Sequence, residues 1–114
     1  MSKELEDRFL AYAQKVRDFC QKLKQNVTNI EYTRQLIKAS ASVGANYTEA
    51  SDDLGPADEK MKLKTSRREV KEAKYFLSLV LTYNDKKLEE ERNFLIDESS
   101  QIQKILSSII QKLK

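Results

Sequence analysis

The sequence predicts an all-α protein, an antiparallel up-down-up-down four-helix bundle. Apolar residues recur at helical spacing in four segments, and no segment alternates apolar and polar residues as a half-buried strand does. Two glycines and one proline in 114 residues are too few for the turns of a sheet fold. A chain of this length is expected to form a single domain, residues 1–114. The helices are expected at about 2–25, 31–51, 57–83 and 86–113.

Apolar stripes justify the first two helices. The first helix carries six apolar residues at alternating spacings of 4 and 3, the pattern of a helix that buries one face. These residues are Leu5, Phe9, Tyr12, Val16, Phe19 and Leu23. Residues 26–29 are expected to break the helix, because Asn and Thr side chains compete for backbone groups. The second helix has one stripe of apolar and small residues: Leu36, Ser40, Val43, Tyr47 and Ala50.

Turn signals bound the last two helices. Residues 52–56 read as a loop, and Pro56 suits the first position of the third helix. The third helix has an apolar side and is expected to end at the polar turn 83–85. That side comprises Val70, Ala73, Phe76, Leu77 and Val80. The fourth helix is expected to bury one face: Leu95, Ile102, Ile105, Ile109 and Leu113. Short connections make successive helices antiparallel.

The composition excludes several classes of function. No histidine is present, which removes imidazole acid–base catalysis and histidine-containing metal sites. The single cysteine, Cys20, is expected to be a small buried apolar residue, and a single thiol favours a reducing compartment. No apolar run approaches 18 residues and no phosphate-binding glycine loop occurs. We therefore expect a cytoplasmic protein without membrane contact, cofactor or enzymatic activity.

Positive charge gathers in one part of the chain. The net charge is +3, yet residues 60–74 alone hold seven basic and two acidic side chains. Six of these cations share one face of the third helix: Lys60, Lys64, Arg67, Arg68, Lys71 and Lys74. They are either a solvated face paired with acids of a neighbouring helix or subunit, or a surface that binds nucleic-acid phosphates. The second interpretation predicts an RNA- or DNA-binding protein.

Carboxylates near the core suggest a polar network. Glu69 is expected near the middle of the apolar side of the third helix, where it needs a cation or an amide donor. Arg34, Lys38 and Asn46 of the second helix are candidates. The predicted network comprises Arg34, Asn46, Glu49, Glu69 and Glu72. A metal cluster of Glu49, Glu69 and Glu72 is an alternative, which the lack of histidine disfavours.

A second face of the second helix suggests self-association. Ala41, Ser42, Ala45 and Glu49 lie away from its apolar stripe. Small residues let another helix approach closely, and in a monomeric bundle this face would be exposed. We therefore expect an oligomer.

Two segments carry a family resemblance. QLIKASASVGANYTEA at 35–50 and EVKEAKYFLSL at 69–79 resemble the two signatures of bacterial proteins encoded in intervening sequences of large-subunit (23S) ribosomal RNA genes. The resemblance spans residues 9–112. Phe76 stands where that family more often has Trp, and Tyr47 where Ile is frequent.

The resemblance implies a four-helix bundle that assembles into a homopentamer. A related branch, the accessory variability determinant of diversity-generating retroelements, is a pentameric bundle that binds nucleic acid and a reverse transcriptase. For this chain the resemblance therefore adds two candidate partners besides itself, a nucleic acid and a protein such as a reverse transcriptase. It also favours structural roles for Asn46, Glu49, Glu69 and Glu72.

Overall fold

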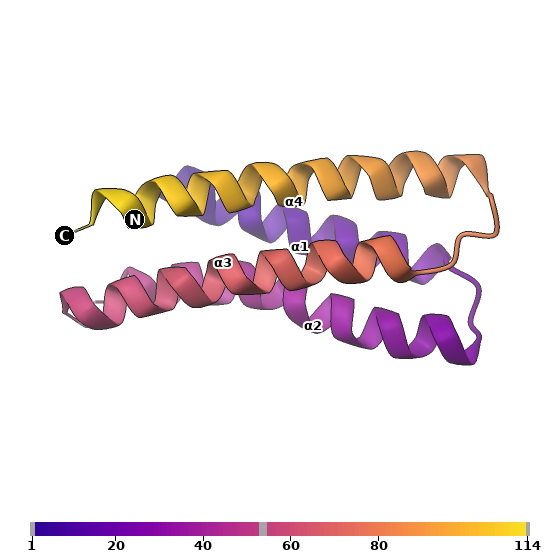
Figure 1. Cartoon of the computed structure of the whole chain (residues 1–114), viewed down its shortest axis with the longest axis horizontal. Helices are drawn as coiled ribbons and strands as arrows, with labels where there is room; N and C mark the ends of the chain where they lie inside the picture. Colours follow the sequence, from indigo (N-terminus) through magenta and orange to yellow (C-terminus); the bar gives the residue numbers. More distant parts are fainter. Residues whose placement is uncertain (1, 53–54, 114) are drawn as a thin grey trace.

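Four helices form a closed ring around one core in the computed structural model, which describes residues 2–52 and 55–113. They are α1 (Lys3–Lys22), α2 (Val27–Ala50), α3 (Pro56–Leu79) and α4 (Lys86–Lys112) (Figure 1). Each helix packs antiparallel on the next, and α4 returns to pack on α1. No strand occurs in these two ranges. The predicted all-α, up-down-up-down four-helix bundle is confirmed.

Polar caps fix where three of the helices begin. The side chains of Ser2, Asn26 and Asp85 each accept a hydrogen bond from a backbone N–H three residues further on, at 3.2, 2.8 and 3.0 Å. Helix α3 begins without a side-chain cap: Gly55, with a positive φ of 93°, precedes Pro56 at the first helical position. Gly55 suits this position because side-chain-bearing residues rarely adopt that φ.

The caps correct three of the predicted boundaries. The segment 26–29 is the start of α2 and not a break before it, because Asn26 caps the helix that begins at Val27. Helix α1 ends at Lys22, earlier than predicted, since Leu23 is already extended. Helix α3 ends at Leu79 and not at the 83–85 turn, because the backbone is extended at Val80.

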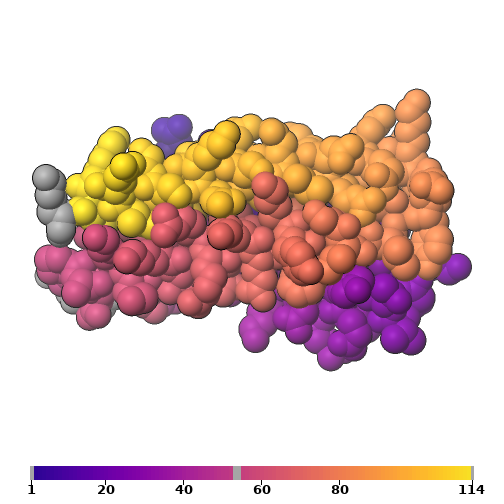
Figure 2. Space-filling view, viewed as in Figure 1, coloured from indigo at the N-terminus to yellow at the C-terminus, as the bar shows by residue number. Residues whose placement is uncertain are grey.

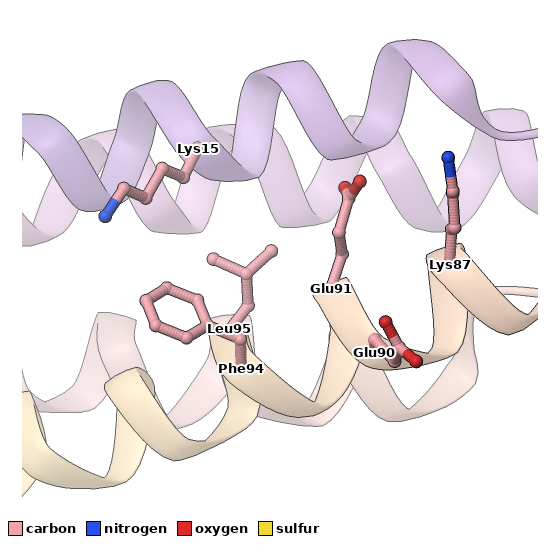
Figure 3. A pocket seen from close by; sticks show the side chains of 6 residues that line it. All are labelled: Lys15, Lys87, Glu90, Glu91, Phe94 and Leu95. Atoms are coloured by element: carbon pink, nitrogen blue, oxygen red, sulfur yellow. The ribbon is translucent and has the colours of Figure 1, made fainter.

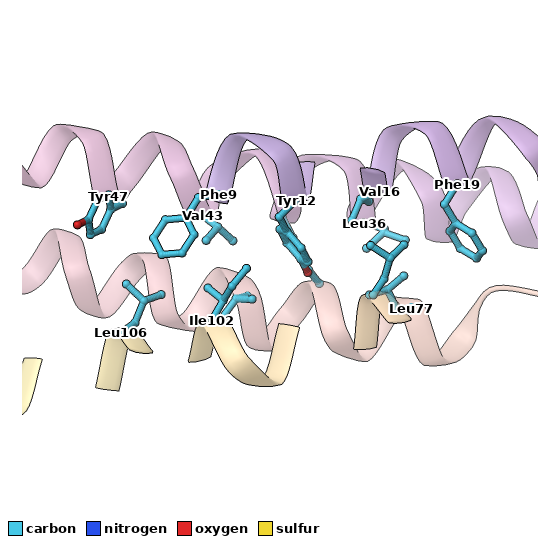
Figure 4. Close-up of a cluster of buried hydrophobic side chains, with 14 of the residues drawn as sticks. Phe9, Tyr12, Val16, Phe19, Leu36, Val43, Tyr47, Leu77, Ile102 and Leu106 are labelled. Atoms are coloured by element: carbon cyan, nitrogen blue, oxygen red, sulfur yellow. The ribbon is translucent and has the colours of Figure 1, made fainter. Parts of the chain in front are cut away.

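The core runs the length of the bundle (Figure 4). The predicted stripes of α1 and α2 are buried, Leu5 partly so, and Phe9 meets Tyr47 edge to face at 4.9 Å between ring centroids. The predicted face of α4 is only partly correct. Its buried row is Leu95, Ser99, Ile102, Leu106 and Ile110, while Ile109 and Leu113 pack at the edge of the core and Ile105 is half-buried.

Two of the four seams between helices also carry a buried polar tie. The Ser66 hydroxyl of α3 donates to the Val43 carbonyl of α2 at 2.7 Å, and both groups are buried. The Tyr12 hydroxyl of α1 lies 2.6 Å from the Ser99 hydroxyl of α4. Because a buried polar group without a partner costs free energy, these pairs fix the rotation of the helices.

Asn29 joins the two connections at one end of the bundle. Its side chain is fully buried and lies at the start of α2. Its Nδ2 donates to the carbonyls of Lys24 and Leu81, both at 3.0 Å, and its Oδ1 accepts from the Leu81 N–H at 2.8 Å. One side chain thus ties the α1–α2 connection to the α3–α4 connection. Among the helices described, none has a stretch long and apolar enough to cross a membrane.

Candidate nucleic-acid interface

The six predicted cations of α3 lie on one side of that helix, away from its core row. The core row is Leu63, Ser66, Val70, Ala73 and Leu77. Because a helix turns 100° per residue, positions four and seven residues apart stay on the same side. We call the side formed by Lys60, Lys64, Arg67, Arg68, Lys71 and Lys74 the basic surface. From Lys60 to Lys74 it is about 21 Å long, at about 1.5 Å per residue.

The basic surface has an outer and an inner row. Lys64, Arg68 and Lys71 are exposed, whereas Lys60, Arg67 and Lys74 recur every seven residues and are half-buried on the side toward α4. The Arg67 guanidinium donates to the Ser107 hydroxyl of α4 at 3.2 Å. The inner row therefore faces a neighbouring helix that offers a neutral hydroxyl at the point of contact.

Few carboxylates neutralise the basic surface. Among the residues described, Arg68 is its one member with a carboxylate within 4.0 Å, that of Glu69 at 4.0 Å. Lys62, on the opposite side of α3, differs from them because it forms a 2.6 Å ion pair with Glu49 of α2. The acids that would pair with the basic surface on a neighbouring helix are thus not found in ranges 2–52 and 55–113. Its cations repel one another and attract an external polyanion.

Glu69 sits at the edge of the α2–α3 seam and not in the middle of the apolar side, which corrects the prediction. Its side chain is 18% exposed, and it lines a small hollow of about 120 Å³ with Gln35, Lys38 and Glu72. Burial raises the pKa of Glu69, and the Glu72 charge raises it further, whereas Arg68 and Lys38 lower it. Among the described residues, Arg68 is the one cation within 4.0 Å of this carboxylate, at 4.0 Å.

The other members of the predicted polar network do not join Glu69. Arg34 lies 4.0 Å from Glu31 on its own helix, and the Asn46 amide donates to the Ser42 carbonyl one turn earlier. Glu49 alone ties two helices, through the Lys62 pair. The five residues thus do not form one network, because Arg34 and Asn46 bond within α2 and Glu49 pairs with Lys62, while Glu69 and Glu72 share the small hollow. No group of three or more carboxylate or thiol side chains in the described chain is placed to hold a metal ion.

Cys20 is buried on α1, as expected of a small apolar residue. Burial raises the pKa of its thiol to about 12. A thiol with so high a pKa is a poor nucleophile at neutral pH.

Sequence reasoning missed the residues that α4 adds beside the basic surface. Between α3 and α4 lies a groove of about 590 Å³. It is lined by Lys74 together with Ser100, Gln103, Lys104, Ser107, Ser108 and Gln111. Figure 2 views the seam where α3 and α4 lie side by side. The available signal was the absence of any acid in the sequence after Glu98.

Two further hollows lie on the faces of α1. Between α1 and α4, a hollow of about 410 Å³ is lined in part by Lys15 and Phe94 (Figure 3). The Lys15 ammonium lies 5.1 Å from the centre of the Phe94 ring, which is 54% exposed. Between α1 and α2, a hollow of about 580 Å³ is lined by small residues, by exposed Leu10 and by charged groups at its rim.

Comparison with known proteins places this bundle in a family. Residues 6–108 match the profile of the 23S rRNA-intervening sequence protein family. The chain belongs to this family. A solved structure is also similar, the 1.70 Å crystal structure of a protein of unknown function from the S23 ribosomal protein family of Bacteroides thetaiotaomicron. The two share 26% identity with a TM-score of 0.79, over 94% of this chain and 98% of that one. No curated protein matches the chain.

Proposed function

We propose that this family member is a non-enzymatic protein that binds nucleic acid, with RNA favoured, through the basic surface of α3. The observation that carries the proposal is the row of six cations, of which Arg68 alone has a carboxylate within 4.0 Å among the described residues. Lysines and arginines spaced along a rod neutralise successive phosphates and release their counterions, which drives binding. Such binding needs a charged surface and no acid–base chemistry, which suits a sequence without histidine.

The salt dependence of binding follows from the number of cations. If each of the six neutralises one phosphate, log affinity falls with log salt at a slope of about −4 for a single strand and about −5 for a duplex. Between about 50 and 200 mM salt, affinity would then fall roughly 300- to 2,000-fold. A shallow slope would mean that few of these cations meet phosphates.

The test is binding of a mixed-sequence structured RNA and a matched DNA duplex across a salt series. The variant changes Lys64, Arg68 and Lys71 to Glu, because these three side chains are exposed and their loss leaves the core intact. The matched control changes Lys24, Lys86 and Lys87 to Glu, three exposed cations in the α1–α2 connection and the first turn of α4. Salt-sensitive binding lost only in the first variant supports the proposal. Absence of binding at low salt, or equal losses in both variants, contradicts it.

The hollow between α1 and α2 favours a second candidate, a protein-interaction or scaffolding module. It is lined by Ala13, Ala41, Gly44 and Ala45, and exposed Leu10 adds apolar surface. Gly44 already brings the two helices close, since a Cβ there would lie 3.3 Å from the Phe9 Cβ. Small apolar residues of this kind admit another helix, so we propose self-association, as a homopentamer, through this hollow. A protein such as a reverse transcriptase is an alternative occupant.

Light scattering separates these cases. A particle about five times the 13.3 kDa chain mass would support the homopentamer, and a monomer at micromolar concentration would contradict it. Ala41→Gln fills the hollow and should dissociate the assembly, whereas Ala57→Gln, at an exposed position of α3, should not. A monomer that nonetheless binds a reverse transcriptase through Ala41 would favour the adaptor role.

A further inference from the structure

The groove between α3 and α4 has an unusual chemical lining. Its volume of about 590 Å³ lies within the range of small-molecule sites, but those sites are mostly apolar. This groove presents two ammonium groups, Lys74 and Lys104, and five neutral side chains that each donate and accept hydrogen bonds. No lining residue is acidic or aromatic. Its chemistry suits a polar, anionic ligand whose recognition needs no stacking.

The groove continues the basic surface onto a second helix. Lys74 belongs to both, and Arg67, also of the basic surface, reaches across to Ser107 on the groove wall at 3.2 Å. Lys104 adds a cation from α4 that the α3 row does not contain. An anionic polymer that follows α3 would therefore pass along the mouth of the groove.

The neutral lining offers groups that suit RNA better than DNA. The ribose 2′-hydroxyl both donates and accepts hydrogen bonds, and it is the group that distinguishes RNA from DNA. Serine hydroxyls and glutamine amides also do both, whereas lysine only donates. Ser108 and Gln111 are exposed at the groove, so their polar atoms are free to reach a ligand. An aromatic lining, which would stack bases, is absent from this groove.

We infer that the α3–α4 groove holds the ribose–phosphate backbone of RNA, with Lys74 and Lys104 on phosphates and the serine and glutamine side chains on 2′-hydroxyls. This inference rests on the proposed function and narrows it to a ligand and a mode of contact. The contacts read the backbone and not the bases, so the groove favours RNA over DNA and is insensitive to the RNA sequence.

Two groove variants test the two kinds of contact. Lys74→Gln with Lys104→Gln should weaken RNA and DNA binding alike and make the salt slope shallower by about 2, one for each lost phosphate contact. Its matched control is Lys86→Gln with Lys87→Gln, two exposed cations outside the groove. Gln103→Ala, Ser108→Ala and Gln111→Ala together should weaken RNA binding about fivefold or more and leave DNA binding and the salt slope unchanged. Alanine keeps the helix, so this variant should fold.

A modified RNA tests the same contact without changing the protein. We compare an RNA duplex with its 2′-O-methylated form, which removes the hydroxyl donor. The unmodified protein should bind the methylated duplex more weakly, and the alanine variant should bind the two equally. Equal binding of both duplexes by the unmodified protein would overturn the inference.

The outcomes separate this inference from the proposed function. If the unmodified protein binds neither RNA nor DNA, the proposed function fails and the groove fails with it. If binding is lost when Lys64, Arg68 and Lys71 become Glu but both groove variants bind like the unmodified protein, the basic surface stands and the groove inference is wrong. Equal loss of RNA and DNA binding in the alanine variant also overturns the 2′-hydroxyl contact.

Discussion

Replacing Asn29 by alanine should destabilise the bundle more than its position near a connection suggests. The fully buried side chain makes three hydrogen bonds, to Lys24 and twice to Leu81. At about 1 kcal/mol for each, their loss would lower the free energy of unfolding by about 3 kcal/mol. Leu81 is 40% exposed, so in the variant water can replace part of the hydrogen bonding that its backbone groups lose. We therefore expect a loss of about 2–3 kcal/mol and a Tm lower by about 10 °C.

Urea and thermal unfolding, followed by circular dichroism at the helix band, measure this loss. Asn93→Ala, at an exposed position of α4, is the control and should change stability by less than about 0.5 kcal/mol. Asn29→Asp keeps the acceptor but sets a carboxylate against two carbonyl oxygens, so at neutral pH it should be less stable than Asn29→Ala. If the free energy of unfolding of Asn29→Ala lies within about 0.5 kcal/mol of that of the unmodified protein, the hydrogen bonds of Asn29 to the two connections do not stabilise the bundle and the reasoning is wrong.

Three further predictions concern buried groups. Because burial raises the folded-state pKa of Glu69 above 4.5, its ionisation opposes folding as pH rises through the folded pKa. Glu69→Gln should therefore be more stable than the unmodified protein at pH 7, and the difference should vanish below about pH 4. Urea unfolding at both pH values measures it. A stability gain that is larger at acid pH than at pH 7 would contradict the prediction. The Cys20 thiol, with a pKa of about 12, should react with an aromatic disulfide reagent only as fast as the protein opens, and immediate labelling would refute its burial. Because the Ser99 hydroxyl donates to the Leu95 carbonyl at 2.7 Å, the Tyr12 hydroxyl donates to Ser99. Ser99→Ala, which leaves the buried phenol without a partner, should then cost about 2 kcal/mol against about 1 kcal/mol for Tyr12→Phe, and the reverse order in chemical unfolding would reject that donor assignment.

Where the sequence pattern was unambiguous, it predicted the fold. Helix α1 has a single apolar row at spacings of 4 and 3, and that row is buried as predicted except for Leu5, which is half-buried. Helix α4 offers two neighbouring apolar rows, and the core takes the one that contains Ser99. A serine interrupts the apolar pattern of this row, and only the structure shows that the Tyr12 hydroxyl hydrogen-bonds to it. The choice between the rows thus depends on a contact 87 residues away along the chain.

The candidate interface was predictable only in part, for a related reason. The basic surface follows from the helical repeat of α3 alone. The groove also requires the rotation of α4, which its core row determines, so Lys104 and Ser107 could not be assigned to the same site as Lys74. Glu69 was misplaced by the same kind of uncertainty, because the helical repeat gives an angle but not which neighbour the side chain meets. The Asn26 cap was misread because the same residue types end and begin helices.

The ring of helices has a kinetic consequence. Three of its four seams join helices that follow one another, so they form from short hairpins, whereas the α1–α4 seam pairs Arg8 with Glu98, 90 residues apart. Of the four seams, this one closes the longest loop and so loses the most chain entropy on forming. Folding rates also fall as contacting residues lie further apart in the sequence. That seam also holds the hollow beside Lys15 and Phe94. We expect the α1–α4 seam to form last and to open first in native-state hydrogen exchange.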